Sequence, residues 1–447
     1  MVNIVTEFVK YINIILIAIY TYYAYRVYRF SDKNKQNRIY RRMSYIIFEI
    51  HFISYLVLYL NSKSTKIIIL YAMEVISLIL VLSLYQWIYV NLSRQILHNM
   101  LLMLTIGYIM LARLSYNKAV KQFIIASAAF GACLILPLLI DKLKYLPELG
   151  WIYGILGIIS LTLVLFWGTE NYGAKNWFHM AGIYFQPSEF VKILFVFCIA
   201  SLLSKRTDFR YVVLVTALAA LHVIILVLEK DLGGALIFFV TYLVMLFVAT
   251  SNPFYFFSGL LAGCGASYLA YRLFGHVRIR VMAWRNPWAL IDNEGYQVTQ
   301  SLFAIGTGGW FGMGLMKGLP TSIPVVTSDF IFSAISEEMG GLFSFCLILI
   351  CISTFVMFIN IAMKLSNHFY KFTALGLSIM YIFQVFLSVG GVTKFIPSTG
   401  VTLPLISYGG SSILSSIMMF NVIQGLYVLG QDRNDKIEKK KRKRETE

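Results

Sequence analysis

Residues 11–60 read YINIILIAIYTYYAYRVYRFSDKNKQNRIYRRMSYIIFEIHFISYLVLYL, two long apolar runs separated by a densely basic segment from Arg26 to Arg42. A helix needs about 20 apolar residues to cross the hydrocarbon core of a bilayer, and each run is close to that length. Backbone groups in lipid must bond within the protein, and neither run alternates like a barrel strand. The stretch therefore predicts two transmembrane helices joined by a charged loop.

The remainder of the chain has the same character. Of its 447 residues, 59% are hydrophobic and only 13% are charged, whereas a soluble domain carries roughly a quarter charged residues. The net charge of +17 does not indicate nucleic acid, because the basic residues gather in short loops and in the tail KIEKKKRKRETE. The five cysteines lie in apolar runs without CxxC spacing, which indicates neither a disulfide framework nor a structural metal site. The sequence predicts an all-α polytopic integral membrane protein.

Apolar segments of spanning length recur along the whole chain. Thirteen are predicted, at residues 11–29, 43–61, 66–90, 97–113, 119–140, 150–168, 189–204, 211–228, 232–250, 254–273, 332–360, 371–389 and 405–430. If the basic segment 26–42 is cytoplasmic, alternation places the other strongly basic short loops and the tail on the same side. We therefore expect an extracytoplasmic N-terminus and a cytoplasmic C-terminus in the cell membrane.

This topology places three unusual segments on the outer face, at residues 169–188, 274–331 and 390–404. The segment 274–331 is the only long connection that we predict, and long ordered loops tend to carry function. The expected organisation is an N-terminal extension of about three helices (residues 1–92), a helical core (93–430) and a basic cytoplasmic tail (431–447).

Several charged residues beside the apolar segments are candidates for chemistry. Arg278, Arg280 and Arg285 stand among aromatic and apolar residues, where they either snorkel at the membrane interface or bind a phosphorylated lipid through their forked guanidinium groups. Asp231 begins a span, where it suits the positive end of a helix and also points toward the outer cavity. Glu189 and Lys192 lie one helical turn apart and can form a local pair.

The segment SDFIFSAISEEMG, residues 328–340, places three of the 21 acidic residues at the edge of an apolar run. A carboxylate near apolar walls has a raised proton affinity, which suits a general base. A solvated boundary residue is the alternative. The pattern alone does not choose among Asp329, Glu337 and Glu338; the two glutamates follow Asp329 by about two helical turns.

Six motifs occur in order along the chain: GAKNW, QPSEFVK, DLGGAL, GYQVTQSLFAIGTGGWFGMGL, SDFIFSAISEEMG and TGVTLPLISYGGSS. With them the chain resembles, from about residue 97 to residue 430, the SEDS family (shape, elongation, division and sporulation; RodA, FtsW and SpoVE). The resemblance implies a ten-helix core with a large extracytoplasmic loop before the eighth core helix, and about three N-terminal transmembrane helices, predicted in residues 1–92, lie outside that core. One departure is Glu229-Lys230-Asp231, where the family usually has Gln-Pro-Asp.

The resemblance also implies an activity. SEDS proteins are peptidoglycan glycosyltransferases that polymerise lipid II at the outer face of the cytoplasmic membrane, together with a class B penicillin-binding protein. Their essential carboxylate corresponds here to Asp329. The implied substrate-binding residues are Lys175, Glu189, Lys192, Asp231, Arg278, Arg280, Arg285, Gln300, Lys394 and Ser407. Either basic residues or a divalent cation (Mg²⁺ or Mn²⁺), held by Asp329 and a nearby acid, would neutralise the diphosphate.

Two other classes of function fit the same features. A flippase for lipid-linked precursors also needs a groove open to lipid and basic residues for diphosphate, and a non-catalytic scaffold needs neither. The clustering of charged residues on one predicted face favours the enzyme, because a transport path would carry them through the middle of the bundle. The sequence leaves open whether the protein serves elongation, division or sporulation.

Overall fold

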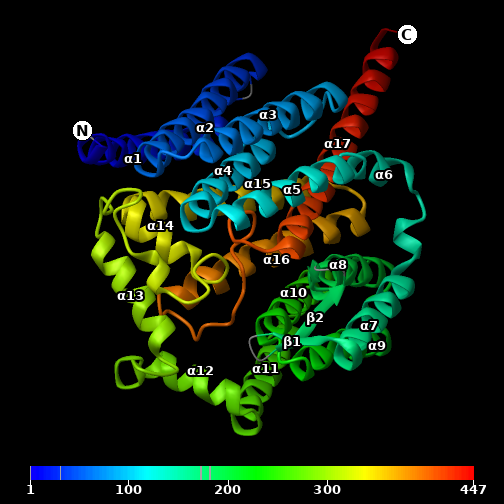
Figure 1. Cartoon of the computed structure of the whole chain (residues 1–447). Helices are drawn as coiled ribbons and strands as arrows, with labels where there is room; N and C mark the ends of the chain where they lie inside the picture. The colour runs from blue at the N-terminus through cyan, green and yellow to red at the C-terminus, as the bar shows by residue number, and fades with distance from the viewer. Residues whose placement is uncertain (1, 31, 172–173, 181–182, 447) are drawn as a thin grey trace.

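The computed structural model of the chain describes residues 2–30, 32–171, 174–180 and 183–446 (Figure 1). Eleven helices within these residues are long and apolar enough to cross a membrane, so the polytopic helical prediction is confirmed. The long helices are α1 (Val2–Arg26), α2 (Lys33–Ser62), α3 (Thr65–Ile88), α4 (Arg94–Leu114), α5 (Tyr116–Cys133), α7 (Gly150–Trp167), α8 (Ser188–Lys205), α9 (Phe209–Leu228), α10 (Leu232–Thr250), α11 (Pro253–Leu273), α15 (Gly341–Lys364), α16 (His368–Val392) and α17 (Gly410–Thr446).

Two of these helices, α8 and α11, are not among the eleven. They lie at two of the thirteen predicted spans, so the full count of thirteen stays a prediction. Helix α8 carries more charge than the eleven allow, since it contains Glu189, Lys192 and Lys205. A short helix, α6 (Leu136–Lys142), follows α5 and packs against α17.

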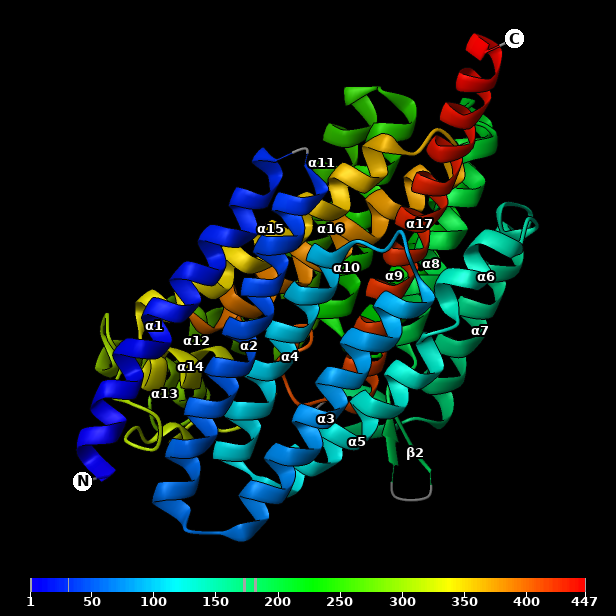
Figure 2. The same ribbon diagram turned by 90° about the horizontal axis from the view of Figure 1, so that it is seen from above.

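The N-terminal extension is packed against the core by helix contacts and by polar side chains. Helix α1 lies against α15, and α2 lies against α4 (Figure 2). The Tyr20 hydroxyl of α1 donates to Asn99 Oδ1 of α4 at 3.0 Å, and Gln95 Nε2 of α4 donates to the Ala24 carbonyl at 2.8 Å. Such interhelical hydrogen bonds contribute roughly 0.6–2 kcal/mol each within a membrane. The extension is therefore an integral part of the bundle.

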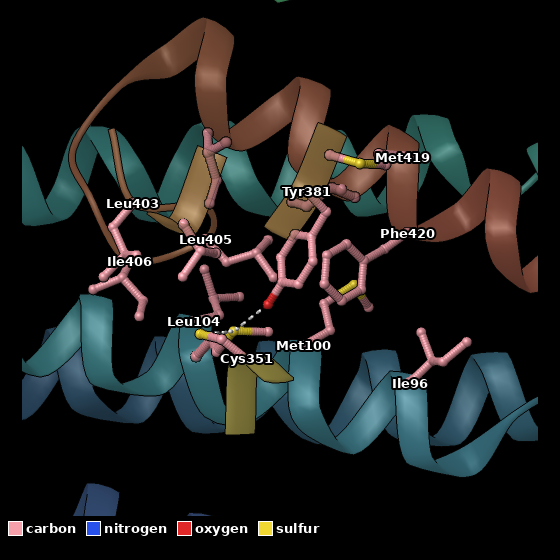
Figure 3. Close-up of a cluster of buried hydrophobic side chains, with 14 of the residues drawn as sticks. Ile96, Met100, Leu104, Cys351, Tyr381, Leu403, Leu405, Ile406, Met419 and Phe420 are labelled. Atoms are coloured by element: carbon pink, nitrogen blue, oxygen red, sulfur yellow. Dashed lines mark hydrogen bonds between the residues drawn. The ribbon is translucent and has the colours of Figure 1, made fainter. Parts of the chain in front are cut away.

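Helix α4 is the centre of the bundle, because every residue from Gln95 to Ala112 is buried. Its apolar side chains meet α16, α17 and the segment before α17 (Figure 3). That segment approaches the helix backbone at Gly107, where an added Cβ would lie only 2.8 Å from the Ile406 carbonyl oxygen. The close approach requires glycine, and it holds the segment 403–409 against the buried helix α4.

The long connection 274–331 contains ordered helices. It comprises α12 (Gly275–Arg285), α13 (Tyr296–Gly308) and two short 3₁₀ turns (Trp288–Leu290 and Pro320–Ser322), and leads into α14 (Ile331–Met339). Helix α14 ends at Gly340, which has φ +93°, so the predicted span 332–360 was wrong at its start: the membrane helix begins at Gly341. Glycine allows this left-handed turn at little cost.

The other two segments predicted to lie on the outer face also differ from simple loops. Residues 169–188 include an antiparallel sheet, in the order β1–β2–β3, made of β1 (Thr169–Asn171), β2 (Ala174–Met180) and β3 (Ile183–Phe185). Four residues of that segment, 172–173 and 181–182, lie outside the described residues, as does 447 in the tail. The predicted span 405–430 was wrong at its start: residues 403–409 form the segment that packs on α4, and the helix begins at Gly410.

Candidate active site

The backbone of Asp329 is held from behind by the segment that packs on α4. The Ser407 hydroxyl donates to the Ser328 carbonyl at 2.6 Å and accepts from the Leu403 amide at 2.9 Å. The Tyr408 amide donates to the Thr327 carbonyl at 2.8 Å. These bonds connect the two residues before Asp329 to a rigid part of the bundle, which is the support that a positioned reactive group requires. Ser407, a predicted substrate-binding residue, therefore contacts the backbone of the site.

Asp329 lies just before α14 and is half-buried. Burial raises its pKa above the ordinary aspartate value, and a hydrogen bond from Ser328 and the nearby Arg280 guanidinium counteract that rise. The carboxyl and the guanidinium face the same point: a Cβ added at Gly400 would lie 3.5 Å from Asp329 Oδ2 and 4.0 Å from Arg280 Nη2. Gly400, with φ +74°, thus keeps side-chain atoms out of the space before both groups.

Arg280 is the arginine of α12 that turns toward this space. It is partly buried, and its Nη1 donates to the Thr399 carbonyl at 3.1 Å. The carboxyls of Asp329 and Asp231 both favour its charged form, so the guanidinium lies within electrostatic reach of two predicted site residues. Trp284 holds the same helix in place, since its Nε1 donates to the Lys394 carbonyl at 3.1 Å.

Asp231 caps α10 from within the site. Its Oδ1 accepts from the Gly234 amide at 2.8 Å, and its Oδ2 accepts from Asn176 at 3.2 Å and Gln186 at 3.2 Å. Burial raises the pKa of this carboxyl, while its hydrogen bonds and Arg280 lower it. The capping interpretation is confirmed, and the residue also faces the same guanidinium as Asp329.

Glu189 and Lys192 form the local pair that their spacing predicted, and the pair extends into the bundle. Lys192 Nζ lies 2.6 Å from Glu189 Oε2 and 3.0 Å from Gln384 Oε1 of α16. The Ser415 hydroxyl of α17 donates to Glu189 Oε2 at 2.6 Å. The Lys192 side chain is only 4% exposed and the Glu189 side chain only 15%, so these contacts join α8, α16 and α17 in a largely buried network. A role in substrate binding stays a prediction for both residues.

The other predicted basic and polar residues lie around the site without joining this group. Arg278 and Arg285 are exposed, and Arg278 Nη2 donates to the Arg272 carbonyl at 3.0 Å. Lys175 Nζ donates to the Phe166 carbonyl at the end of α7, at 3.1 Å. Lys394 and Gln300 are partly exposed. Their roles toward a substrate stay predictions.

Comparison with known proteins identifies the family of this chain. Residues 94–428 match the family described as Cell cycle protein, which comprises FtsW, RodA and SpoVE. The chain belongs to this family, the SEDS family. Peptidoglycan glycosyltransferase RodA of Mycobacterium bovis is 34% identical over 328 residues, which cover 69% of each chain. The probable peptidoglycan glycosyltransferase FtsW of Buchnera aphidicola is 34% identical over 280 residues, or 60% of this chain and 79% of that relative.

Solved structures share the SEDS fold. A chain from a peptidoglycan synthase complex aligns with 76% of this chain and 98% of its own length, with a TM-score of 0.64 at 24% identity. The crystal structure of RodA from Thermus thermophilus aligns with 75% of this chain and 96% of its own, with a TM-score of 0.56 at 24% identity. The matched family region begins at α4, so α1–α3 precede it.

The departure from the family at Glu229 places a second carboxyl close to Asp231. Glu229 is fully buried, and neither of its carboxyl oxygens has a hydrogen-bond partner among the described residues. Burial, with Asp231 nearby, raises the pKa of Glu229 to about 9. The side chain is therefore neutral at physiological pH and adds no second negative charge beside Asp231.

Glu337 and Glu338 have structural partners. Glu338, which is fully buried, lies 2.9 Å from Arg113 Nε of α4, and the same guanidinium donates to the Gly318 carbonyl at 3.2 Å. Glu337 accepts from the Leu319 amide at 2.8 Å. Both carboxylates thus hold the segment 318–319 onto α14. The ranking of Asp329 as the reactive acid stays a prediction.

Two residues near the site were missed in the sequence. Lys118 of α5 donates to Thr327 Oγ1 at 2.8 Å, and its ammonium lies 5.4 Å from the centre of the Tyr408 ring. Gln384 of α16 accepts from Lys192 and donates to the Thr402 carbonyl at 3.1 Å. A polar residue inside a predicted span was the only signal for Gln384. In the sequence, Lys118 resembles an ordinary lysine at the end of a membrane span.

The divalent cation stays a prediction. No group of three or more His, Cys, Asp or Glu side chains within the described ranges is arranged to hold a metal ion. Magnesium is commonly bound by one or two carboxylates together with substrate phosphates and water. Among the predicted ligands, Asp329 is half-buried, and its Oδ2 would lie 3.5 Å from a Cβ added at Gly400.

Proposed function

We propose that this chain polymerises lipid II into glycan strands, with Asp329 as the general base. The observation that carries the proposal is that the Asp329 carboxyl and the Arg280 guanidinium converge on Gly400, in a member of the SEDS family. Its relatives are named peptidoglycan glycosyltransferases, and transfer of a sugar from a diphosphate requires both a base and a cation.

The chain's own groups would divide the work as follows. The Asp329 carboxylate accepts the proton of the attacking hydroxyl of the acceptor sugar. A C–O bond forms at the anomeric carbon of the donor sugar as its bond to the diphosphate oxygen breaks, and the diphosphate leaves with the electron pair. Burial favours proton uptake by Asp329, because it raises the pKa of the carboxyl. General-base catalysis of this kind contributes roughly 10²–10⁴-fold.

Arg280 is proposed to bind the diphosphate, because a guanidinium matches phosphate oxygens in a fork. Its bond to the Thr399 carbonyl and the packing of α12 fix its position beside Asp329. We also propose that Asp329, with the diphosphate oxygens, holds Mg²⁺ or Mn²⁺. When bound, such an ion would neutralise negative charge on the leaving group.

We further propose that the site faces outward from the cytoplasmic membrane. Arg94 Nη1 lies 2.9 Å from Asn37 Oδ1, which places the basic segment 26–42 beside the start of α4 at one end of the bundle. Lys10 donates to the Gly312 carbonyl at 3.3 Å, so the early part of α1 lies with the connection that leads to Asp329, at the other end. Cysteines introduced at residues 275–327 should label from outside, and those at residues 32–42 should not.

The proposed partner is a class B penicillin-binding protein. Support comes from the shared fold with a chain of a peptidoglycan synthase complex that coordinates polymerization and crosslinking. The decisive experiment supplies purified protein with lipid II, with and without a candidate class B partner, and measures glycan strands by gel. EDTA should slow the reaction if a divalent cation takes part. Movement of lipid II across vesicles without polymer would instead support the flippase.

Arg280→Gln is expected to move the acid limb of the pH profile to higher pH. The base must be deprotonated, so activity falls as pH drops through the pKa of Asp329, and Arg280 normally lowers that pKa. We also expect KM for lipid II to rise about tenfold or more, because charged hydrogen bonds contribute about 1.5–3 kcal/mol. The measurement is initial rate against pH and lipid II concentration.

Arg278→Gln is the matched control on the same helix. Arg278 is exposed and contacts the Arg272 carbonyl, so its loss should leave the acid limb where it is. An unchanged limb and KM in Arg280→Gln would remove Arg280 from the site.

A further inference from the structure

Two hollows lie between α3 of the N-terminal extension and the first helices of the family core. One, of about 350 Å³, lies at the Asp329 end of the bundle and is lined by Lys66, Arg113, Tyr116 and Met316 among others. The second, of about 410 Å³, is lined almost entirely by apolar residues of α3 and α5, including Met73, Leu84, Phe123 and Leu134. Helices α3 and α5 run side by side along this length (Figure 2).

The two hollows lie along the same face of α3 and of α5, and we call the aligned pair the groove. On α3, Lys66 of the first hollow is two helical turns from Met73 and five from Leu84 of the second, so all three share a face. On α5, Tyr116 and Phe123 are related in the same way. The two facing stripes therefore continue from the polar hollow into the apolar one, over about 27 Å of helix rise.

The two ends of the groove differ in chemistry. At the Asp329 end, Lys66 is exposed, and Arg113 is partly exposed while its Nε and Nη2 bind Glu338 and Gly318. A guanidinium carries five donors, so these two bonds do not exhaust its capacity. Within the membrane, the polar groups of the second hollow, Ser77 and Ser127, lie 3.3 Å apart and bond to one another. The groove thus has a cationic head and an apolar tail.

We propose that an anionic glycerophospholipid of the bilayer occupies this groove. Its phosphate would lie between Lys66 and Arg113, and one acyl chain would follow the stripes between α3 and α5. A bilayer surrounds the groove with this lipid, and the Lys66 ammonium, together with the remaining donors of Arg113, favours an anionic headgroup over a zwitterionic one. An acyl chain would also supply the packing contacts that an empty gap between two apolar helices forfeits.

The position of the headgroup gives the lipid a structural consequence. It would connect the extension, through Lys66, to the core, through Arg113 and Tyr116. Arg113 also bonds to the Gly318 carbonyl of the connection that precedes Asp329 and to Glu338 of α14, which follows Asp329. Met316 of that connection lines the same hollow. The bound lipid would therefore stabilise the extension and the connection together, at a place separate from Asp329.

The test is native mass spectrometry of the full chain purified in mild detergent and incubated with phosphatidylglycerol or phosphatidylcholine. We expect one retained phosphatidylglycerol per chain and a higher melting temperature with that lipid. Gly131→Leu should abolish retention, because a Cβ at Gly131 meets nothing within 4 Å and the side chain would fill the tail groove without a clash. Lys66→Gln should reduce the preference for phosphatidylglycerol about fivefold.

Each variant has a matched control. Lys121→Gln removes a charge from an exposed residue of α5 that does not line the groove, and Ala128→Leu adds the same side chain on an exposed position one turn before Gly131. Both controls should retain the lipid. Equal retention by variants and controls, loss of all lipid by the unmodified chain, or retention of a polyprenyl diphosphate in its place would overturn the proposal. These readouts need no polymerisation, so they stand apart from the proposed activity.

Discussion

Asp329→Asn is expected to reduce the rate of lipid II polymerisation at least ~100-fold while the protein still folds and inserts. Asparagine keeps the size of the side chain and most of its hydrogen bonding, but it cannot accept the proton of the attacking hydroxyl. The backbone bonds at Ser328 and Thr327 do not involve the carboxyl, so the fold should persist. The measurement is the initial rate of glycan synthesis, with size-exclusion chromatography and melting temperature as checks on folding.

Two further variants make this result specific. Asp329→Glu should also be poor, because one added methylene moves the carboxylate beyond the tolerance of a positioned site. Glu337→Gln should cost less activity, because Glu337 serves the Leu319 amide and does not face the space before Gly400. Near-normal polymerisation by folded Asp329→Asn protein would eliminate Asp329 as the base and revive the flippase alternative.

The membrane helices were predictable because lipid imposes a single length and one backbone solution. The ends of the spans were harder. Glu337 and Glu338 shortly precede Gly340, but the predicted span ran through them, and the backbone at Gly340, with φ +93°, shows that α14 and α15 are separate helices. The strands outside the membrane, such as β2, gave no comparable signal, because short strands lack a fixed length or a strict pattern.

The site was predictable in its parts but not in its selection of residues. Asp329 came from a motif, whereas the choice among the three arginines required the structure. On a helix, Arg278 and Arg285 share one face and Arg280 lies on the opposite face. The sequence could have made that distinction only if residues 275–285 had been recognised as α12. The connection to Asp231 was beyond it, since no local pattern brings residues 231, 280 and 329 together.

Lys192→Met is expected to be the most destabilising single change among the predicted site residues. Lys192 and Glu189 are 2.6 Å apart and nearly buried, so removing the ammonium leaves a carboxylate whose partner is the Ser415 hydroxyl. Loss of one member of a buried pair costs about 3–5 kcal/mol, mainly because the remaining charge is uncompensated. Gln384 also loses its donor. The measurement is the free energy of unfolding of the purified protein in detergent, with the circular dichroism of its helices as the signal.

The double variant Glu189→Gln/Lys192→Met separates this explanation from simple loss of packing. If the stranded charge is the main cost, removing it should recover much of the lost stability, since a buried pair replaced as a whole is often nearly neutral. Lys230→Met is the control for the substitution itself, because the Lys230–Glu170 pair is 46% and 60% exposed and should contribute at most about 1 kcal/mol. A double variant no more stable than Lys192→Met would mean that the Lys192 side chain supports α8, α16 and α17 by its bond to Gln384 and its packing, and that its charge is secondary.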